Sequence, residues 1–189
     1  MKAAIILAGG KSKRFGRNKA LIKLGDQPLL NHVVDAALKV VDEIVVAVGK
    51  DNNIVEYVDA LPKTVKVLKD TMDGKNPLIG MITGMSAIKS RYTAILSCDI
   101  PFARAEVLEY LFGKARGADA VIPRWPNGNI EPLHSIYKVS STLHATEETV
   151  KIRRFRILHM IQRLGTLLYV PTNEIRKLDR NLITFFNIN

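Results

Sequence analysis

The chain has 189 residues, of which 47% are hydrophobic and 24% charged, and its 28 Lys and Arg against 18 Asp and Glu give a formal net charge of +10. This composition excludes an intrinsically disordered chain, the single cysteine (Cys98) excludes an intramolecular disulfide framework, and the apolar runs fall far short of the ~20 residues that span a bilayer. The positive charge favours polyanionic partners, but 6% aromatic residues without an RNP-like strand or zinc-finger spacing argue against the readout of nucleic-acid bases.

Short apolar segments alternate with amphipathic segments along the chain. The pattern predicts strands at 2–8, 43–49, 64–69, 92–98, 118–122, 133–138 and 167–171. It predicts helices at 28–41, 51–60, 77–88 and 103–115 and within the basic region 140–164, with a last apolar run at 182–186. Only a short, turn-rich segment precedes the strand at 133–138, which favours an antiparallel insertion there.

Strands separated by helices indicate a mostly parallel sheet that is covered on both faces. We therefore expect an α/β fold, with one Rossmann-like, three-layer α/β/α domain over residues 1–189. The apolar stretch at 3–8 is too short for a signal-peptide core, so we expect a cytoplasmic protein that does not bind a membrane. Ligands of open α/β sheets bind beyond the carboxyl ends of the strands, and the candidate residues are therefore those that follow each strand.

A basic, glycine-rich segment follows the first strand. Residues 9–19 contain three glycines, a serine and five basic side chains, among them Arg14 and Lys19. Glycine lets backbone N–H groups approach an anion closely, and nearby cations neutralise several negative charges. The segment lacks both the Walker and the G-x-G-x-x-G pattern, but it is suited to hold a polyphosphate. The alternative is a solvated basic turn.

Single carboxylates follow two later strands. Asp70 comes after the strand at 64–69, and Asp99 comes after the strand at 92–98. A carboxylate in this place can hold Mg²⁺ while substrate phosphates complete its coordination, although Asp is also common at turns and helix caps. Between them, Gly80 and Gly84 leave one helix face bare, either for a neighbouring strand or for a planar nucleobase.

Three other features of the sequence have less specific readings. Cys98 has no base partner and is expected to pack as a small apolar residue. The four histidines lack metal-ligand spacing, and only His134 lies in a segment with a motif. The basic segment 151–163 is either a solvated helix face or a surface for a substrate phosphate or an acidic partner protein.

Together, these motifs resemble those of the nucleotidyltransferases related to the molybdenum-cofactor guanylyltransferase. The resemblance begins with Leu7-Ala8-Gly9-Gly10, Ser12, Arg14, Phe15, Gly16 and Lys19, and continues through Leu24-Gly25-Asp26-Gln27-Pro28-Leu29, Asp70, Pro77-Leu78-Ile79-Gly80, Cys98-Asp99-Ile100-Pro101, Glu131-Pro132-Leu133 with Tyr137, and Phe186-Asn187-Ile188-Asn189. The first motif is specific for the superfamily, and the order of the later ones extends the likeness over nearly the whole chain.

The resemblance implies a nucleotidyltransferase fold and an Mg²⁺-dependent transfer of GMP from GTP to the terminal phosphate of molybdopterin, with release of pyrophosphate. It implies nucleotide binding by Leu7, Ala8, Gly9, Gly10, Lys19, Asp70 and Asp99, catalytic roles for Lys19, Arg14 and Asp99, and Mg²⁺ binding by Asp99. Molybdoenzymes or other proteins of cofactor biosynthesis are the partners that it suggests. An attacking phosphate is already anionic and needs no general base, which agrees with a site made of glycines, cations and carboxylates.

The sequence is also compatible with several other functions. A related enzyme could use CTP on molybdopterin, or a nucleotidyltransferase of another kind could act on a sugar or alcohol phosphate. A non-catalytic carrier of GTP or cofactor, or a nucleic-acid-binding module, would belong to a different class. Because the residues around the base are placed only loosely by the sequence, the reaction type is better defined than the choice of base.

Overall fold

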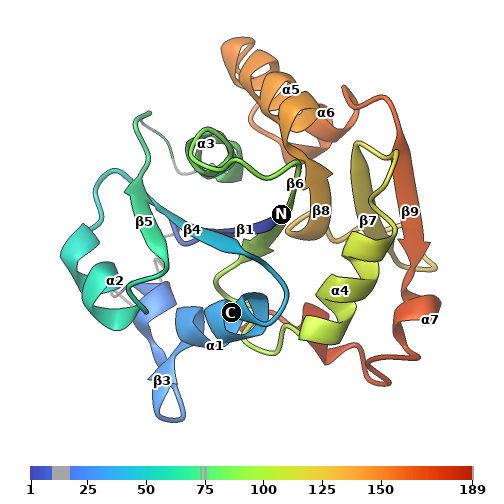
Figure 1. Ribbon diagram of the computed structural model, residues 1–189. Coiled ribbons are helices and arrows are strands. Elements are labelled where there is room, and N and C mark those ends of the chain that lie inside the picture. The colour runs from blue at the N-terminus through green and yellow to red at the C-terminus, as the bar shows by residue number, and fades with distance from the viewer. Residues whose placement is uncertain (10–17, 73, 75, 189) are drawn as a thin grey trace.

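A central sheet runs through the molecule with helices on both of its faces (Figure 1). The computed structural model describes residues 1–9, 18–72, 74 and 76–188. In this part of the chain seven strands form the sheet in the order β5-β4-β1-β6-β8-β7-β9. They are β1 (Lys2–Leu7), β4 (Glu43–Val48), β5 (Lys66–Lys69), β6 (Tyr92–Ser97), β7 (Ala120–Arg124), β8 (His134–Lys138) and β9 (Leu167–Pro171).

Most neighbouring strands of the sheet are parallel. β1 pairs in parallel with β4 and β6, β4 with β5, and β7 with β9. β8 is antiparallel to both β6 and β7, which confirms the predicted antiparallel insertion. The carboxyl ends of β1, β4, β5 and β6 therefore meet at one edge of the sheet, and the residues that follow them are neighbours in space.

The helices form two layers, one on each face of the sheet (Figure 1). One layer contains α1 (Leu29–Leu38), α2 (Ile54–Ala60) and α4 (Ala105–Gly113), and the other contains α3 (Pro77–Met85), α5 (Val139–Lys151) and α6 (Ile157–Ile161). β1 alternates between the two cores, because Ala4 and Ile6 pack into the first and Ala3 and Ile5 into the second. The predicted three-layer α/β/α fold is confirmed. Among the described residues, no helix has the length and apolar character needed to cross a membrane.

The predicted elements agree with the structure except at some of their ends and in five segments. The basic region 140–164 contains two helices, α5 and α6, because Arg153 adopts a left-handed conformation (φ 56°) and ends the first. The apolar run at 182–186 forms a short 3-10 helix, η2 (Ile183–Phe185). Four short elements were not predicted because they are too short to show a period: η1 (Lys19–Leu21), the hairpin of β2 (Lys23–Leu24) and β3 (Gln27–Pro28), and α7 (Thr172–Ile175).

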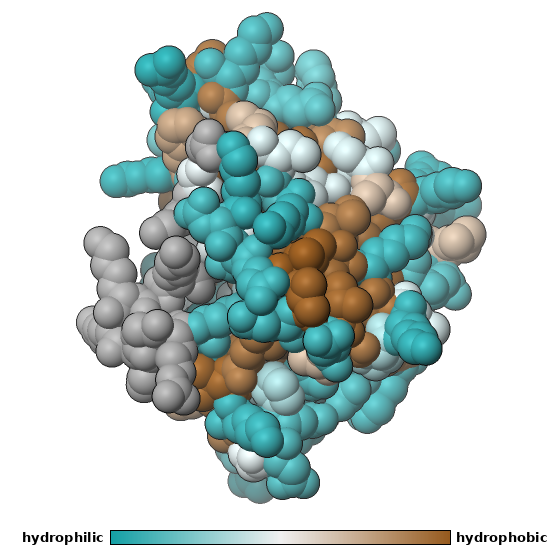
Figure 2. Space-filling view, turned by 90° about the vertical axis from the view of Figure 1, so that its left-hand side faces the viewer, coloured by the Kyte–Doolittle hydropathy of each residue, from teal (hydrophilic) through white to brown (hydrophobic). Residues whose placement is uncertain are grey.

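Helix α2 leaves apolar side chains on the surface beside the edge strand β5. Its Tyr57 is fully buried, whereas Val55 and Val58 on its outer side are 57% and 53% exposed. Figure 2 shows hydrophobic side chains gathered on this side of the molecule, which carries α2 and β5. α2 is thus held to the sheet through one face only.

Helix α3 packs unusually close to the sheet because of its two glycines. A Cβ atom on Gly84 would lie 2.5 Å from Cγ2 of Ile5 in β1, so only glycine fits at that position. A Cβ on Gly80 would lie 2.9 Å from Cδ2 of Leu7 and 3.9 Å from Oδ1 of Asp70. The sequence left open whether this bare helix face meets a neighbouring strand or a nucleobase. At Gly84 it meets a strand, because Ile5 of β1 packs directly against it. Gly80 instead lines a hollow beside Asp70.

Candidate active site

The turns after β1 and β4 touch each other through two glycines. A Cβ on Gly9 would lie 3.3 Å from the backbone nitrogen of Gly49, and a Cβ on Gly49 would lie 3.1 Å from the carbonyl oxygen of Gly9. The carbonyl of Ala8 accepts hydrogen bonds from the hydroxyl of Tyr57 at 3.1 Å and from Nδ2 of Asn52 at 3.5 Å. These contacts fix the backbone where the glycine-rich segment begins.

A hollow of about 180 Å³ lies beside these turns, and we call it the Asp70 hollow. Leu7, Gly9, Asp70, Gly80 and Ser97 are among its lining residues. They come from the ends of β1, β5 and β6 and from the first turn of α3, so the parallel strands bring them to one edge of the sheet. Gly9 and Gly80 add no side chain to its walls, which leaves room beside Asp70.

Asp70 is held rigidly in this hollow. Its backbone N–H donates to the carbonyl of Val48 at 2.9 Å, and its Oδ1 accepts a hydrogen bond from the Thr83 hydroxyl at 2.8 Å. The residue is only 6% exposed, and burial raises the pKa of its carboxyl above the usual range while the Thr83 hydrogen bond lowers it in part. A carboxylate fixed in this way can accept hydrogen bonds from a ligand N–H group.

Lys19 and Asp99 form an ion pair at the same edge. Nζ of Lys19 lies 2.9 Å from Oδ2 of Asp99, and their side chains are 17% and 21% exposed. Oδ1 of Asp99 accepts a hydrogen bond from the hydroxyl of Ser97, which itself lines the Asp70 hollow. Lys19 begins η1, which Asn18 caps by accepting a hydrogen bond from the backbone of Ala20. A cation and a carboxylate therefore stand beside the hollow, although 80 positions separate them in the sequence.

The structure brings together most of the residues that the sequence singled out. Leu7 and Gly9 line the hollow with Asp70, and Lys19 and Asp99 adjoin it through Ser97. Ala8 is buried behind the hollow, and Gly10 and Arg14 lie outside the described residues. Four supporting residues were not predicted from the sequence: Ser97, Thr83, Tyr57 and Asn52. Ser97 could have been found from its place two residues before Asp99, because it ends the strand that leads to this carboxylate.

Cys98 packs as predicted. It is 8% exposed, and burial raises the pKa of its thiol to about 12, so the thiol stays protonated near neutral pH. It contributes to the core below the site, and the thiol takes no part in the arrangement of Lys19 and Asp99.

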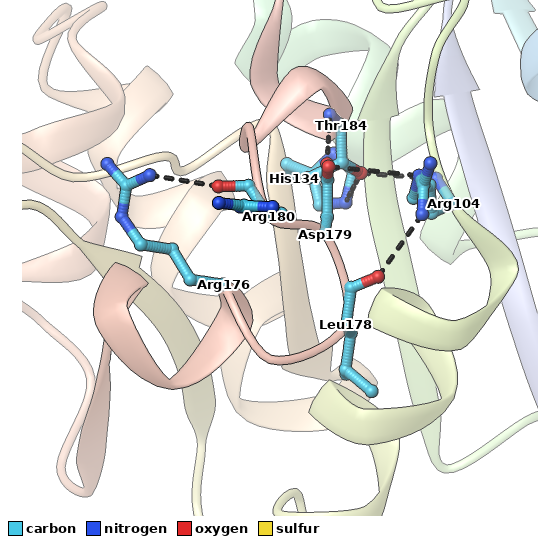
Figure 3. Close-up of polar contacts among 7 residues, drawn as sticks. All are labelled: Arg104, His134, Arg176, Leu178, Asp179, Arg180 and Thr184. Carbon is cyan, nitrogen blue, oxygen red and sulfur yellow. Dashed lines mark hydrogen bonds and ion pairs between the residues drawn. The ribbon is translucent and has the colours of Figure 1, made fainter.

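His134 is a buried core residue beside the C-terminal segment (Figure 3). Its Nε2 lies 3.4 Å from the hydroxyl oxygen of Thr184, which also accepts a hydrogen bond from the backbone N–H of Arg104. The backbone N–H of Thr184 donates to Asp179 at 2.8 Å, and the ring of Phe185 packs against the imidazole with centroids 5.0 Å apart. Nδ1 of His134 has no hydrogen-bond partner among the described residues, which favours a neutral ring.

Burial of His134 should make the protein less stable in mild acid. Burial lowers the pKa of this imidazole from 6.5 to about 3, so below pH 6.5 the unfolded chain binds a proton that the folded chain does not. The free energy of unfolding should fall by about 1 kcal/mol for this residue between pH 6.5 and 5.5. Urea unfolding at the two pH values measures this change. His134→Gln should abolish it, and the exposed His144→Gln should not; an unchanged pH dependence in His134→Gln would contradict the assignment.

The basic segment 151–163 is largely exposed. Its apolar members Ile152 and Phe155 are 46% and 45% exposed, and the carbonyl of Phe155 accepts a hydrogen bond of 2.5 Å from Nδ2 of Asn76. Because Asn76 also lines the Asp70 hollow, this segment lies close to the site at Phe155. Whether its cations bind an anion or only solvent stays a prediction.

Comparisons with known proteins agree with this arrangement. Residues 4–163 match the family model of the "MobA-like NTP transferase domain". The chain is 32% identical to the "Probable molybdenum cofactor guanylyltransferase" of Methanosarcina mazei, over 100% of this chain and 86% of that protein. It is 30% identical to the protein of the same name from Thermococcus gammatolerans, over 97% of this chain and 92% of that protein. The crystal structure of the molybdopterin-guanine dinucleotide biosynthesis protein A from Archaeoglobus fulgidus superimposes with a TM-score of 0.82 at 28% identity. The superposition covers 100% of this chain and 92% of that one.

Proposed function

Because this chain belongs to the family of MobA-like NTP transferases, we propose that it transfers the GMP part of GTP to the terminal phosphate of molybdopterin. An oxygen of that phosphate attacks the α-phosphorus of GTP. The bond from the α-phosphorus to the bridging oxygen breaks, and pyrophosphate leaves with that electron pair. The product is the guanine dinucleotide form of the cofactor.

The observation that carries this proposal is the Lys19–Asp99 pair beside the Asp70 hollow. The attacking phosphate is anionic already, so the protein has to position two anions and neutralise charge rather than remove a proton. In the proposed site, the backbone of Leu7, Ala8 and Gly9 holds the nucleotide. Lys19 stabilises the charge that develops on the phosphates, and Arg14 is proposed to act with it.

Asp99 fits the requirements of a magnesium ligand. Among the described residues, no three His, Cys, Asp or Glu side chains lie close enough to form a metal site made by protein alone. Mg²⁺ in phosphoryl-transfer sites is usually bound by one or two carboxylates and completed by substrate phosphates and water, and the partly exposed carboxylate of Asp99 suits that pattern. When bound there, Mg²⁺ would neutralise phosphate charge during the transfer.

A pyrophosphate-release assay with molybdopterin and Mg²⁺ tests the proposed function. GTP, CTP and ATP are compared at equal concentrations, and we expect turnover with GTP. Turnover with CTP alone would change the proposed substrate. Binding of GTP without pyrophosphate release would indicate a carrier instead of an enzyme.

We propose that Asp70 recognises the guanine base of GTP. Guanine presents N–H donors on its Watson–Crick edge, and the free oxygen of a rigid, buried carboxylate is a strong acceptor for them. Asp70→Asn should therefore weaken GTP binding about 10- to 100-fold. Isothermal titration with GTP and CTP measures the change, and Asp59→Asn on the exposed side of α2 is the matched control. Equal GTP affinity in Asp70→Asn and Asp59→Asn would contradict this role.

A further inference from the structure

A second and larger hollow lies next to the Asp70 hollow. It has a volume of about 660 Å³ and lies between the segment 125–132 and helix α6, and we call it the Glu131 hollow. Trp125, Asn129, Glu131, Ile157 and Leu158 are among its lining residues. Its volume falls within the range of ~300–1,000 Å³ that is usual for small-molecule sites. The roles proposed so far for this chain leave it without a ligand.

The two hollows are neighbours, because consecutive residues line them. Leu133 lines the Asp70 hollow, and the preceding Pro132 lines the Glu131 hollow. The carbonyl of Leu133 accepts a hydrogen bond from the backbone N–H of Ser97 at 3.2 Å, and the Ser97 hydroxyl donates to Asp99, so Leu133 is fixed near the Lys19–Asp99 pair. On the other side, Asn76 of the first hollow is tied to Phe155, two residues before Ile157 of the second. A ligand in the Glu131 hollow can thus extend toward the reacting phosphates.

Glu131 provides one partly buried carboxylate in this hollow. Its Oε1 accepts a hydrogen bond from Nε1 of Trp125 at 2.6 Å, and its Oε2 has no hydrogen-bond partner among the described residues. Burial raises the pKa of this carboxyl above its usual range, and the Trp125 hydrogen bond lowers it in part. The carboxylate is thus oriented through one oxygen, and its other oxygen can accept a hydrogen bond from a ligand.

The backbone around Glu131 is rigid. Its N–H donates to the carbonyl of Pro123 at 3.0 Å, and its carbonyl accepts hydrogen bonds from the backbone of His134 and from the hydroxyl of Ser135. The indole of Trp125 packs edge-on against Phe185, with ring centroids 5.8 Å apart. A site held in this way is organised before its ligand arrives, so less ordering entropy opposes binding.

We propose that the Glu131 hollow binds the heterocycle of the acceptor substrate, with Glu131 as the residue that recognises a 2-amino-4-oxo pyrimidine edge. This inference rests on the proposed function, which supplies a pterin as the acceptor. Such an edge presents an amino group and a ring N–H side by side, and a carboxylate is the complementary acceptor. Trp125 fixes the carboxylate from one side, and Ile157 and Leu158 of α6 form an apolar wall for the ring system. The ligand's phosphate would then lie toward Lys19 and Asp99.

Two simple pteridines test this recognition. Pterin carries the 2-amino group, whereas lumazine has an oxo group in its place and so lacks one donor. By NMR titration, the wild-type protein should bind pterin about 10- to 100-fold more tightly than lumazine. Glu131→Gln, which keeps the acceptor for Trp125 but loses the charge, should weaken pterin binding by the same factor. The exposed Glu147→Gln on α5 is the control and should bind pterin like the wild type.

GTP titrations of the same variants separate this inference from the proposed function. Unchanged GTP affinity in Glu131→Gln, together with weaker pterin binding, supports the inference. Equal binding of pterin and lumazine, absence of binding of both, or a loss of GTP affinity in Glu131→Gln would overturn it. If the wild type binds GTP in those cases, the proposed function stands without this site; if it binds no nucleotide, the proposed function fails as well.

Discussion

Replacing Asp99 with asparagine should lower the rate of guanylyl transfer by about 10²–10³-fold and leave the fold intact. Asparagine keeps the shape of the side chain and an acceptor for Ser97, but it removes the charge proposed to bind Mg²⁺. Because the Lys19 side chain is 17% exposed, the change leaves no fully buried charge at Lys19. Initial rates of pyrophosphate release at increasing Mg²⁺ concentrations measure the effect.

Two further variants define what the loss of activity means. Lys19→Met should slow turnover by a similar factor at saturating Mg²⁺, because it removes a cation that is proposed to stabilise the transition state. Asp26→Asn in the exposed turn between β2 and β3 changes the net charge equally and should keep full activity. If Asp99→Asn retains normal Mg²⁺-dependent activity, the assignment of the metal to Asp99 is wrong.

Gly84→Val should lower the free energy of unfolding by about 3 kcal/mol, because the core has no room for a side chain there. A Cβ at this position would lie 2.5 Å from Cγ2 of Ile5 and 2.8 Å and 2.9 Å from its Cγ1 and Cδ1. Ile5 is fully buried in β1, in register with Val45 on one side and Ile95 on the other, so it cannot move away. Urea unfolding followed by circular dichroism measures the loss.

A matched glycine and a double variant test the cause of this loss. No atom lies within 4 Å of a Cβ built on Gly113 at the end of α4, so Gly113→Ala should be neutral or stabilising by about 0.5 kcal/mol. Ile5→Ala removes the three clashing side-chain atoms, so the double variant Gly84→Val/Ile5→Ala should lose less stability than the sum of the two single losses, because residues in contact do not have additive effects. A Gly84→Val protein as stable as the wild type would show that α3 can move off the sheet.

The chain order of strands and helices was readable from the sequence because it depends on local periodicity. The runs at 2–8 and 92–98 and the helix that starts at Pro77 lie within one or two residues of β1, β6 and the start of α3. The rule that ligands bind at the carboxyl ends of parallel strands then placed Asp70 and Asp99 at one edge of the sheet. The motif resemblance, which continues from residue 7 to the C-terminus, is supported by the family model that matches residues 4–163.

The contacts that make up the site depended on the tertiary structure, because they join residues distant in the chain. No period or spacing indicates that Lys19 pairs with Asp99, that Thr83 holds Asp70, or that Gly84 is needed for its approach to Ile5. The Glu131 hollow forms only when α6 packs beside the segment 125–132. Through local patterning, the sequence thus determined the elements and the edge of the sheet at which we propose that the reaction takes place. The packing of those elements decided which side chains meet there, since long-range contacts are chosen by the fold as a whole.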